Sequence, residues 1–133
     1  MSPAPVEHRQ EIGGAVHGWC EAGQGGVPLV LLHGIGSNAQ SWAAQLRDLG
    51  AKRRVVAWNL PGYGASTPLA CRQPGPDAYA DALAAFLAAQ GITRCDLLGH
   101  SLGGLLAARM AARVPGQVRR LILSVRKAHS SSP

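Results

Sequence analysis

Short apolar runs that alternate with helix-like segments limit most strongly how this 133-residue chain can fold. The run at residues 27–32 is continuously apolar, which is typical of a strand buried on both faces. Further strands are expected at residues 15–20, 54–58, 95–98 and 118–124, and helices at residues 41–49, 77–90 and 102–113. Buried strands that alternate with helices imply parallel strands joined by right-handed crossovers. The expected fold class is therefore α/β.

The length and composition are those of a single folded unit. A chain of 133 residues fits one domain. Hydrophobic residues make up 47% of the sequence and charged residues 15%, which excludes a disordered chain. We expect an N-terminal tail over residues 1–10, one α/β domain over residues 11–124, and an irregular C-terminal tail over residues 125–133.

Charge and hydropathy argue against two kinds of partner. The 13 Lys and Arg residues outnumber the 7 Asp and Glu residues, but they form short groups scattered beside apolar segments. Few aromatic side chains are present for base stacking, so no nucleic-acid partner is expected. The longest apolar run, residues 27–32, is too short to cross a bilayer, so no membrane partner is expected.

The cysteines and the N-terminus indicate a cytoplasmic protein without a cofactor. Cys20, Cys71 and Cys95 are odd in number and widely spaced, which favours small buried residues over a disulfide framework or a zinc site. The first ten residues contain no apolar stretch, so no secretory signal is expected. The chain contains neither a phosphate-binding loop nor an H-E-x-x-H pattern, and neither a cofactor nor a metal ion is expected.

The segment Gly99-His100-Ser101-Leu102-Gly103 has the pattern G-x-S-x-G between an expected strand and an expected helix. In that context a strained turn lifts the serine hydroxyl above the sheet, and small neighbours such as Gly99 and Gly103 tolerate the turn. The amide of Leu102, at a helix N-terminus, would point to where an oxyanion forms. The alternative is an ordinary glycine-bearing turn.

A second glycine-bearing segment follows the strand at residues 27–32. Gly34 and Gly36 allow the backbone to turn its amides inward, and Ile35 is expected to donate the second one. His33 is expected to be a loop histidine bonded to the backbone, and His100 to point away from the Ser101 hydroxyl.

The same segment also fits the start of a dinucleotide-binding unit. Residues 34–39 match G-x-G-x-x-A after a buried strand. The position that would hold the ribose carries Asn59 and not an acid, and residues 99–104 stay unexplained. This alternative is therefore the weaker one.

Three motifs in order, His33-Gly34, residues 59–64 and residues 99–104, resemble those of the α/β-hydrolase family over residues 12–124. The resemblance implies the N-terminal half of that fold: about six of eight strands, mostly parallel, with helices on both faces. It also implies that Ser101 is the nucleophile, that Leu102 and Ile35 form the oxyanion hole, and that the substrate is a small ester-like molecule. The loop at residues 61–66 would shape the entrance to the site. The family usually has Asp where this chain has Asn59.

The family's remaining catalytic groups have no counterpart in the expected order, in which an acid and then a histidine follow the serine. No Asp or Glu occurs after Asp96, and the only later histidine, His129, is expected to be a solvated tail residue. We therefore expect a truncated domain, either a hydrolase with impaired activity or a non-catalytic remnant. The strand at residues 118–124 would form an exposed sheet edge through which copies could associate.

Overall fold

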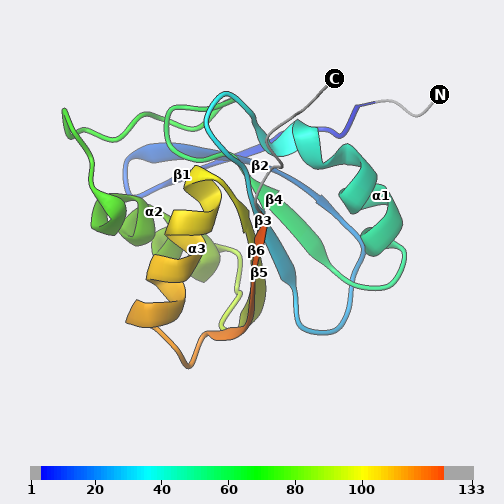
Figure 1. The fold of residues 1–133 in the computed structure, drawn as a ribbon. Helices are drawn as coiled ribbons and strands as arrows, with labels where there is room; N and C mark the ends of the chain where they lie inside the picture. The colour runs from blue at the N-terminus through cyan, green and yellow to red at the C-terminus, as the bar shows by residue number, and fades with distance from the viewer. Residues whose placement is uncertain (1–3, 125–133) are drawn as a thin grey trace, which may run out of the picture.

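The computed structural model describes residues 4–124, which form one sheet and four helical segments (Figure 1). In chain order the elements are β1 (His8–Ile12), β2 (Ala15–Ala22), β3 (Leu29–Leu32), the 3-10 helix η1 (Ala39–Trp42), α1 (Ala43–Gly50), β4 (Val55–Trp58), α2 (Pro76–Ala89), β5 (Cys95–His100), α3 (Leu102–Arg113) and β6 (Val118–Ser124).

The six strands lie in the order β1-β2-β4-β3-β5-β6. Strands β4, β3, β5 and β6 run parallel, whereas β1 and β2 pair antiparallel with each other and β2 pairs antiparallel with β4. Strand β3 is central, and Leu32 at its end is in register with Trp58 of β4 and Gly99 of β5. The expected α/β class and the six-stranded, mostly parallel sheet are confirmed.

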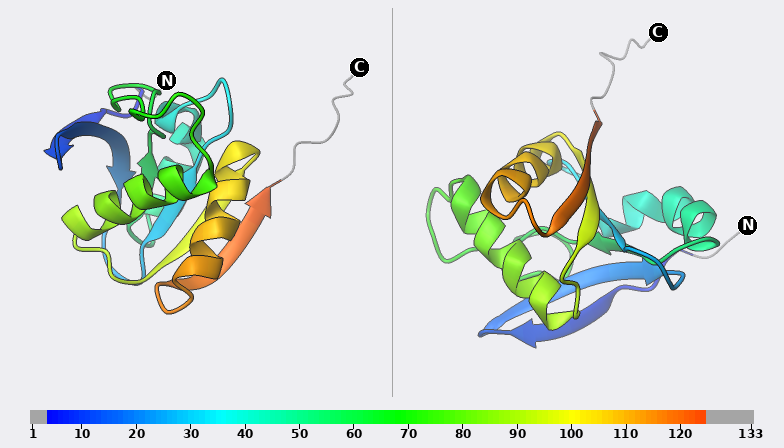
Figure 2. Two further views of the ribbon diagram at one scale, coloured as in Figure 1. Left: turned by 90° about the vertical axis from the view of Figure 1, so that its left-hand side faces the viewer. Right: turned by 90° about the horizontal axis from the view of Figure 1, so that it is seen from below.

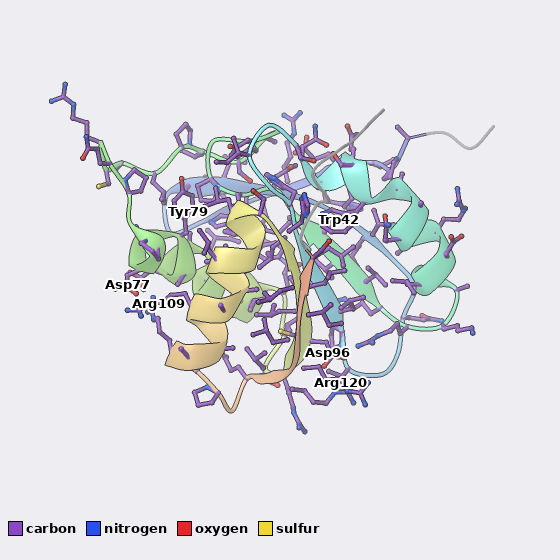
Figure 3. The ribbon with its side chains drawn as sticks, in the orientation of Figure 1. Trp42, Asp77, Tyr79, Asp96, Arg109 and Arg120 are labelled. Carbon is purple, nitrogen blue, oxygen red and sulfur yellow. The ribbon has the colours of Figure 1, made fainter. Side chains whose placement is uncertain are left out.

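Helices cover both faces of the sheet, as expected (Figures 1 and 2). Helices α2 and α3 pack on one face over a core that includes Trp58, Phe86 and Met110. Helix α1 packs on the other face, where Leu46 contacts a smaller cluster around Leu31. An exposed ion pair links these two helices (Figure 3). Nε of Arg109 in α3 lies 2.7 Å from Oδ1 of Asp77 in α2.

Three local expectations are wrong. Residues 8–10, expected in a tail, form the start of β1, which carries mostly exposed polar side chains and so shows no apolar pattern. The helical segment begins before residue 41, because the side chain of Asn38 accepts a hydrogen bond from the Ser41 amide and caps η1. Cys71 is exposed, whereas Cys20 and Cys95 are buried as expected.

Strand β6 is an edge strand within residues 4–124, where it pairs with β5 alone. Leu121, Ile122 and Leu123 are 40%, 48% and 52% exposed. Self-association through this strand stays a prediction, and His129 lies outside the described residues. Across residues 4–124, every helix is too short or too polar to span a membrane.

Candidate active site

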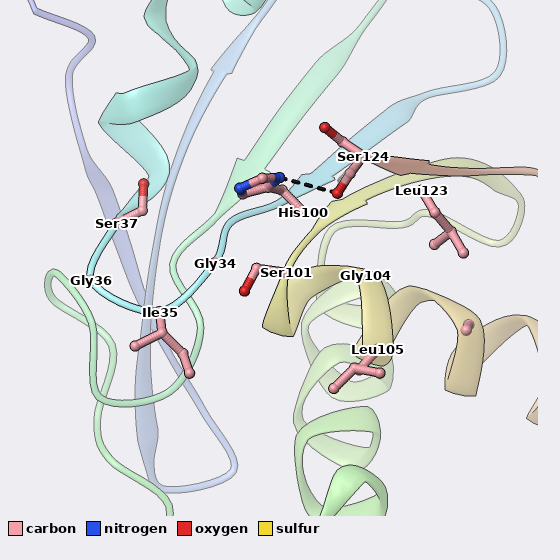
Figure 4. A pocket seen from close by; sticks show the side chains of 11 residues that line it. Gly34, Ile35, Gly36, Ser37, His100, Ser101, Gly104, Leu105, Leu123 and Ser124 are labelled. Atoms are coloured by element: carbon pink, nitrogen blue, oxygen red, sulfur yellow. Dashed lines mark hydrogen bonds between the residues drawn. The ribbon is translucent and has the colours of Figure 1, made fainter. Parts of the chain in front are cut away.

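Ser101 occupies a sharp turn between β5, which ends at His100, and α3, which begins at Leu102. Its backbone angles are φ 57° and ψ −120°, and within residues 4–124 no other non-glycine residue has a positive φ. Such a conformation costs about 1–3 kcal/mol and persists only where the surrounding structure enforces it. The turn leaves the Ser101 side chain exposed beside the loop at residues 34–37 (Figure 4).

Two glycines allow this turn by close backbone contact. A Cβ atom at Gly99 would lie 2.2 Å from the carbonyl oxygen of Gly103, and one at Gly103 would lie 2.0 Å from the carbonyl oxygen of Leu32. Both distances are far below any real carbon–oxygen contact. The first and last positions of the G-x-S-x-G pattern therefore admit only glycine, because β3, β5 and α3 meet there.

The two amides singled out by the sequence each follow a residue at a close backbone approach, because Leu102 follows Ser101 and Ile35 follows Gly34. The Ser101 carbonyl accepts hydrogen bonds from the amides of Gly104 (2.9 Å) and Leu105 (3.2 Å), which fixes the first turn of α3. The amides of Leu102 and Ile35 donate to no acceptor within residues 4–124. Free amides at a helix N-terminus and in an adjacent loop can stabilise negative charge on a ligand oxygen.

The loop at residues 34–37 approaches Ser101 closely. A Cβ atom at Gly34 would lie 2.8 Å from the Cβ atom of Ser101, so only glycine fits at this position. Gly36 has a φ of 79°, in the left-handed region, and turns the chain toward η1. Ile35, between them, is 74% exposed.

Neither histidine near the turn contacts the Ser101 hydroxyl. His33 is buried, donates from Nδ1 to the Gly34 carbonyl (2.8 Å) and accepts at Nε2 from the Leu60 amide (3.1 Å). Burial lowers its pKa below the ordinary value, so the neutral ring is favoured. His100 donates from Nδ1 to the Ser124 carbonyl (3.1 Å), so this bond is directed toward β6 and not toward Ser101 (Figure 4).

A pocket of about 700 Å³ opens beside Ser101. None of the residues that line it is Asp, Glu, Lys or Arg; they are Gly34, Ile35, Gly36, Ser37, His100, Ser101, Gly104, Leu105, Ala108, Leu123 and Ser124. Leu105 is 68% exposed and faces this pocket. The loop at residues 61–66 does not line it, and Tyr63 packs edge-on against His33 instead.

Two further observations complete the surroundings. Within residues 4–124, no three His, Cys, Asp or Glu side chains converge in a way that could hold a metal ion. Glu7, which the sequence places in a tail, accepts hydrogen bonds from Asn59 and from the Ala65 amide. Nothing in the local sequence around Glu7 signals this contact, because its partners lie more than 50 positions away.

Comparison with known proteins identifies the family. Residues 27–132 match the model of the family that is described as alpha/beta hydrolase fold. This chain belongs to the α/β-hydrolase fold family. Family membership decides against the dinucleotide-binding alternative for residues 34–39.

Several curated relatives share this part of the α/β-hydrolase fold. The chain is 37% identical, over 92% of its length, to the dihydrolipoyllysine-residue acetyltransferase component of the acetoin cleaving system of Pseudomonas putida. It is 38% identical, over 74% of its length, to the 2-hydroxymuconate semialdehyde hydrolase of a Pseudomonas strain. These matches cover 33% and 36% of the two relatives, so the chain spans about a third of their length.

Solved structures show the same architecture. A crystal structure of a membrane phospholipase A, described as a bacterial virulence factor, has a TM-score of 0.83 and 35% identity, and the match covers 90% of this chain and 39% of that one. An epoxide hydrolase from Vigna radiata has a TM-score of 0.82 at 20% identity, over 90% of this chain and 39% of that one, and shares the fold.

Proposed function

We propose that Ser101 is the nucleophile of a two-step acyl transfer. The Ser101 oxygen attacks the carbonyl carbon of an ester-like substrate, and the carbonyl oxygen takes up the negative charge. The amides of Leu102 and Ile35 donate hydrogen bonds to that oxygen, while water takes the proton from the Ser101 hydroxyl. When the intermediate collapses, the bond to the leaving oxygen breaks and that oxygen takes a proton from water, so the alcohol is released. Water or a second acceptor then attacks the acyl-serine and frees Ser101. The strained backbone of Ser101 is the observation that carries this proposal.

The pocket supports an uncharged acyl group as the part of the substrate next to Ser101. Ile35, Leu105 and Leu123 present exposed apolar side chains to it, and no side chain of fixed charge lines it. An anionic group would be desolvated there without a cationic partner, which is unfavourable. Both hydrolases and an acetyltransferase component occur among the relatives, so water or another nucleophile could accept the acyl group.

The second candidate is a non-catalytic remnant of the same fold. The sequence contains no Asp or Glu after Asp96, so these 133 residues supply no acid in the family's order. A serine without a general base is a weak nucleophile at neutral pH. Loss of triad groups costs on the order of a millionfold in turnover, although about a thousandfold acceleration over water can survive.

Hydrolysis of p-nitrophenyl acetate and p-nitrophenyl octanoate by the wild type and by Ser101→Ala separates the two functions. We expect slow release of p-nitrophenol by the wild type, acylation of the peptide that contains Ser101 in mass spectrometry, and loss of both in the variant. Cys71→Ser is the matched control, because the exposed Cys71 thiol could also attack an activated ester. Equal rates for the wild type and Ser101→Ala would retire the catalytic proposal in favour of the non-catalytic remnant.

A further inference from the structure

The side chain of Asn59 joins the end of β4 to the loop that carries Ile35. Asn59 follows β4 directly and is 2% exposed. Its Oδ1 accepts a hydrogen bond from the amide of Ala39 (2.7 Å), the first residue of η1. Its Nδ2 donates to Oε2 of Glu7, from the segment before β1. One buried amide group therefore connects the N-terminal segment to the start of η1.

The two ends of an amide group are not equivalent, and this makes Glu7 important. Only Oδ1 of Asn59 can accept from the Ala39 amide, whereas Nδ2 would face it donor to donor. A carboxylate on the opposite side accepts from Nδ2 and so selects the orientation in which Oδ1 meets Ala39. Without that acceptor, Nδ2 loses its partner, and the orientation of the amide depends on the Ala39 contact alone.

The backbone is shaped around the Glu7 carboxylate. The Ala65 amide donates to the same Oε2 atom at 2.8 Å. A Cβ atom at Gly18 would lie 2.4 Å from this oxygen, and one at Gly64 would lie 2.6 Å from it. The side chain of Gln40 also donates to the carbonyl of Pro5 (2.9 Å), which holds the same segment against η1. Glu7 thus occupies a fitted site, although it lies near the N-terminus.

Asn59 and its neighbour Leu60 hold the Ile35 loop at both ends. At the start of the loop, the Leu60 amide donates to Nε2 of His33, whose Nδ1 donates to the Gly34 carbonyl. At the end of the loop, Asn59 accepts from Ala39. Within the loop, the amide of Ser37 donates to the Gly34 carbonyl (3.2 Å), whereas Ile35 is largely exposed. The position of the Ile35 amide therefore depends on the two attachments.

We propose that Glu7 is a positioning residue for the Ile35 amide and acts through the side chain of Asn59. The inference rests on the proposed function only for its effect on catalysis. The positioning itself is a property of the fold. Loss of the Glu7 carboxylate loosens residues 35–39 and leaves the centre of the sheet unchanged.

Amide hydrogen exchange of four variants tests the positioning directly. We expect Glu7→Ala to speed exchange at the Ala39 amide by about tenfold, because its acceptor is no longer oriented. Glu7→Gln keeps an acceptor oxygen and is expected to stay close to the wild type. The Leu97 amide in the middle of β5 is the internal control and should not change.

Together the variants form a double-mutant cycle of Glu7 and Asn59. In its second half, the expected effect of Glu7→Ala on exchange at the Ala39 amide is reversed. In Asn59→Asp, a carboxylate can accept from Ala39 with either oxygen, but it faces the Glu7 carboxylate and is repelled. Glu7→Ala in the Asn59→Asp background should therefore slow exchange at Ala39, whereas in the Asn59 background it speeds exchange. Equal effects of Glu7→Ala in the two backgrounds, or equal acceleration at Leu97, would overturn the proposal.

Ester hydrolysis supplies the catalytic half of the test. The Ile35 amide acts on charge that develops in the transition state, so Glu7→Ala should lower kcat by about tenfold with little change in KM. If Ser101→Ala leaves hydrolysis unchanged, the proposed function is wrong. Hydrogen exchange of the Glu7 and Asn59 variants still tests whether Glu7 positions residues 35–39. If Ser101 is required and Glu7→Ala changes only KM, the proposed link to catalysis is wrong.

Discussion

The two ends of strand β5 are held by different physical means. At its carboxyl end, Gly99 and Ser101 are fixed by backbone packed against backbone, with no charged group among the residues that line the adjoining pocket. Near its amino end, Asp96, which is labelled in Figure 3, is 1% exposed and forms ion pairs with Arg53 and Arg119. One end is sensitive to the addition of a single carbon atom, and the other to the loss of a charge.

The Asp96 cluster is well satisfied for a buried carboxylate. Arg119 donates to both Asp96 oxygens, from Nε at 3.0 Å and from Nη2 at 2.8 Å. Arg53 donates to Asp96 Oδ2 at 2.8 Å and also to the Val27 carbonyl. The hydrogen bonds from Arg119, together with those from Arg53, lower the pKa of Asp96 to about 2 despite its burial. Buried charges are tolerated where they are paired and hydrogen-bonded in this way.

Gly103→Ala should give the largest effect. Its new Cβ atom would lie 2.0 Å from the Leu32 carbonyl oxygen, so α3 must move away from β3. We expect a loss of about 3 kcal/mol or more in the free energy of unfolding, measured by urea denaturation.

Gly104→Ala is the matched control for that change. Both glycines lie in the first turn of α3 and gain the same helix propensity. A Cβ atom at Gly104 meets its nearest neighbour at 3.4 Å, an ordinary contact. Similar stabilities of the two variants would show that the carboxyl end of β5 does not depend on close packing.

Acid should destabilise the amino end of β5, with a loss in the free energy of unfolding smaller than that expected for Gly103→Ala. The pKa of Asp96 in the folded chain, about 2, lies below the ordinary value of 3.8 for an aspartate, so the ionised form stabilises the fold fully above pH 4. This contribution, about 2 kcal/mol, is lost as the pH falls from 4 toward 2. Unfolding of the wild type and of Asp96→Asn, compared between pH 2 and pH 5, isolates it.

Asp48→Asn is the control for the acid experiment, since Asp48 belongs to an exposed pair with Arg47. Exposed pairs contribute little, so this variant should follow the pH profile of the wild type. If the free energy of unfolding of Asp96→Asn depends on pH in the same way as that of the wild type, the charge of Asp96 does not stabilise the amino end of β5.

Ser101→Gly should give the smallest effect, and a stabilising one. Glycine adopts a φ of 57° and a ψ of −120° without the strain that serine carries, although it loses more chain entropy on folding. The net gain is expected to be about 1 kcal/mol, as is common where a strained residue serves function. Ser101→Ala keeps the strain and should match the wild type in thermal unfolding. Equal stabilities of the glycine and alanine variants would argue against strain at this turn.

The glycine-dependent end of β5 could be predicted because its determinants are local. Five consecutive residues, 99–103, carry the pattern, and the expected strand and helix on either side give it meaning. The loop at residues 34–37, which follows β3, could be predicted for the same reason, because its glycines are also a local signal. Strand β1 was missed because an edge strand with exposed polar side chains leaves no periodic signal.

The charge-dependent end could not be predicted because its partners are distant in sequence. Asp96 meets Arg53 across 43 positions and Arg119 across 23, and many other arginines were equally plausible by composition. Asn59 meets Glu7 across 52 positions. Such pairs are created by the order of the strands, and the local pattern around either residue is silent about the other.

The order of the strands also sets a delay during synthesis. Central strand β3 can pair with β4 soon after it is made, but its other edge waits for β5, far downstream in the chain. At about 5–20 residues per second on the ribosome, that wait lasts several seconds. During it, the apolar edge of Leu29–Leu32 is open to chaperones or to mispairing. The turn that presents Ser101 therefore forms only after β5 has been made, well after β3 and β4 have paired.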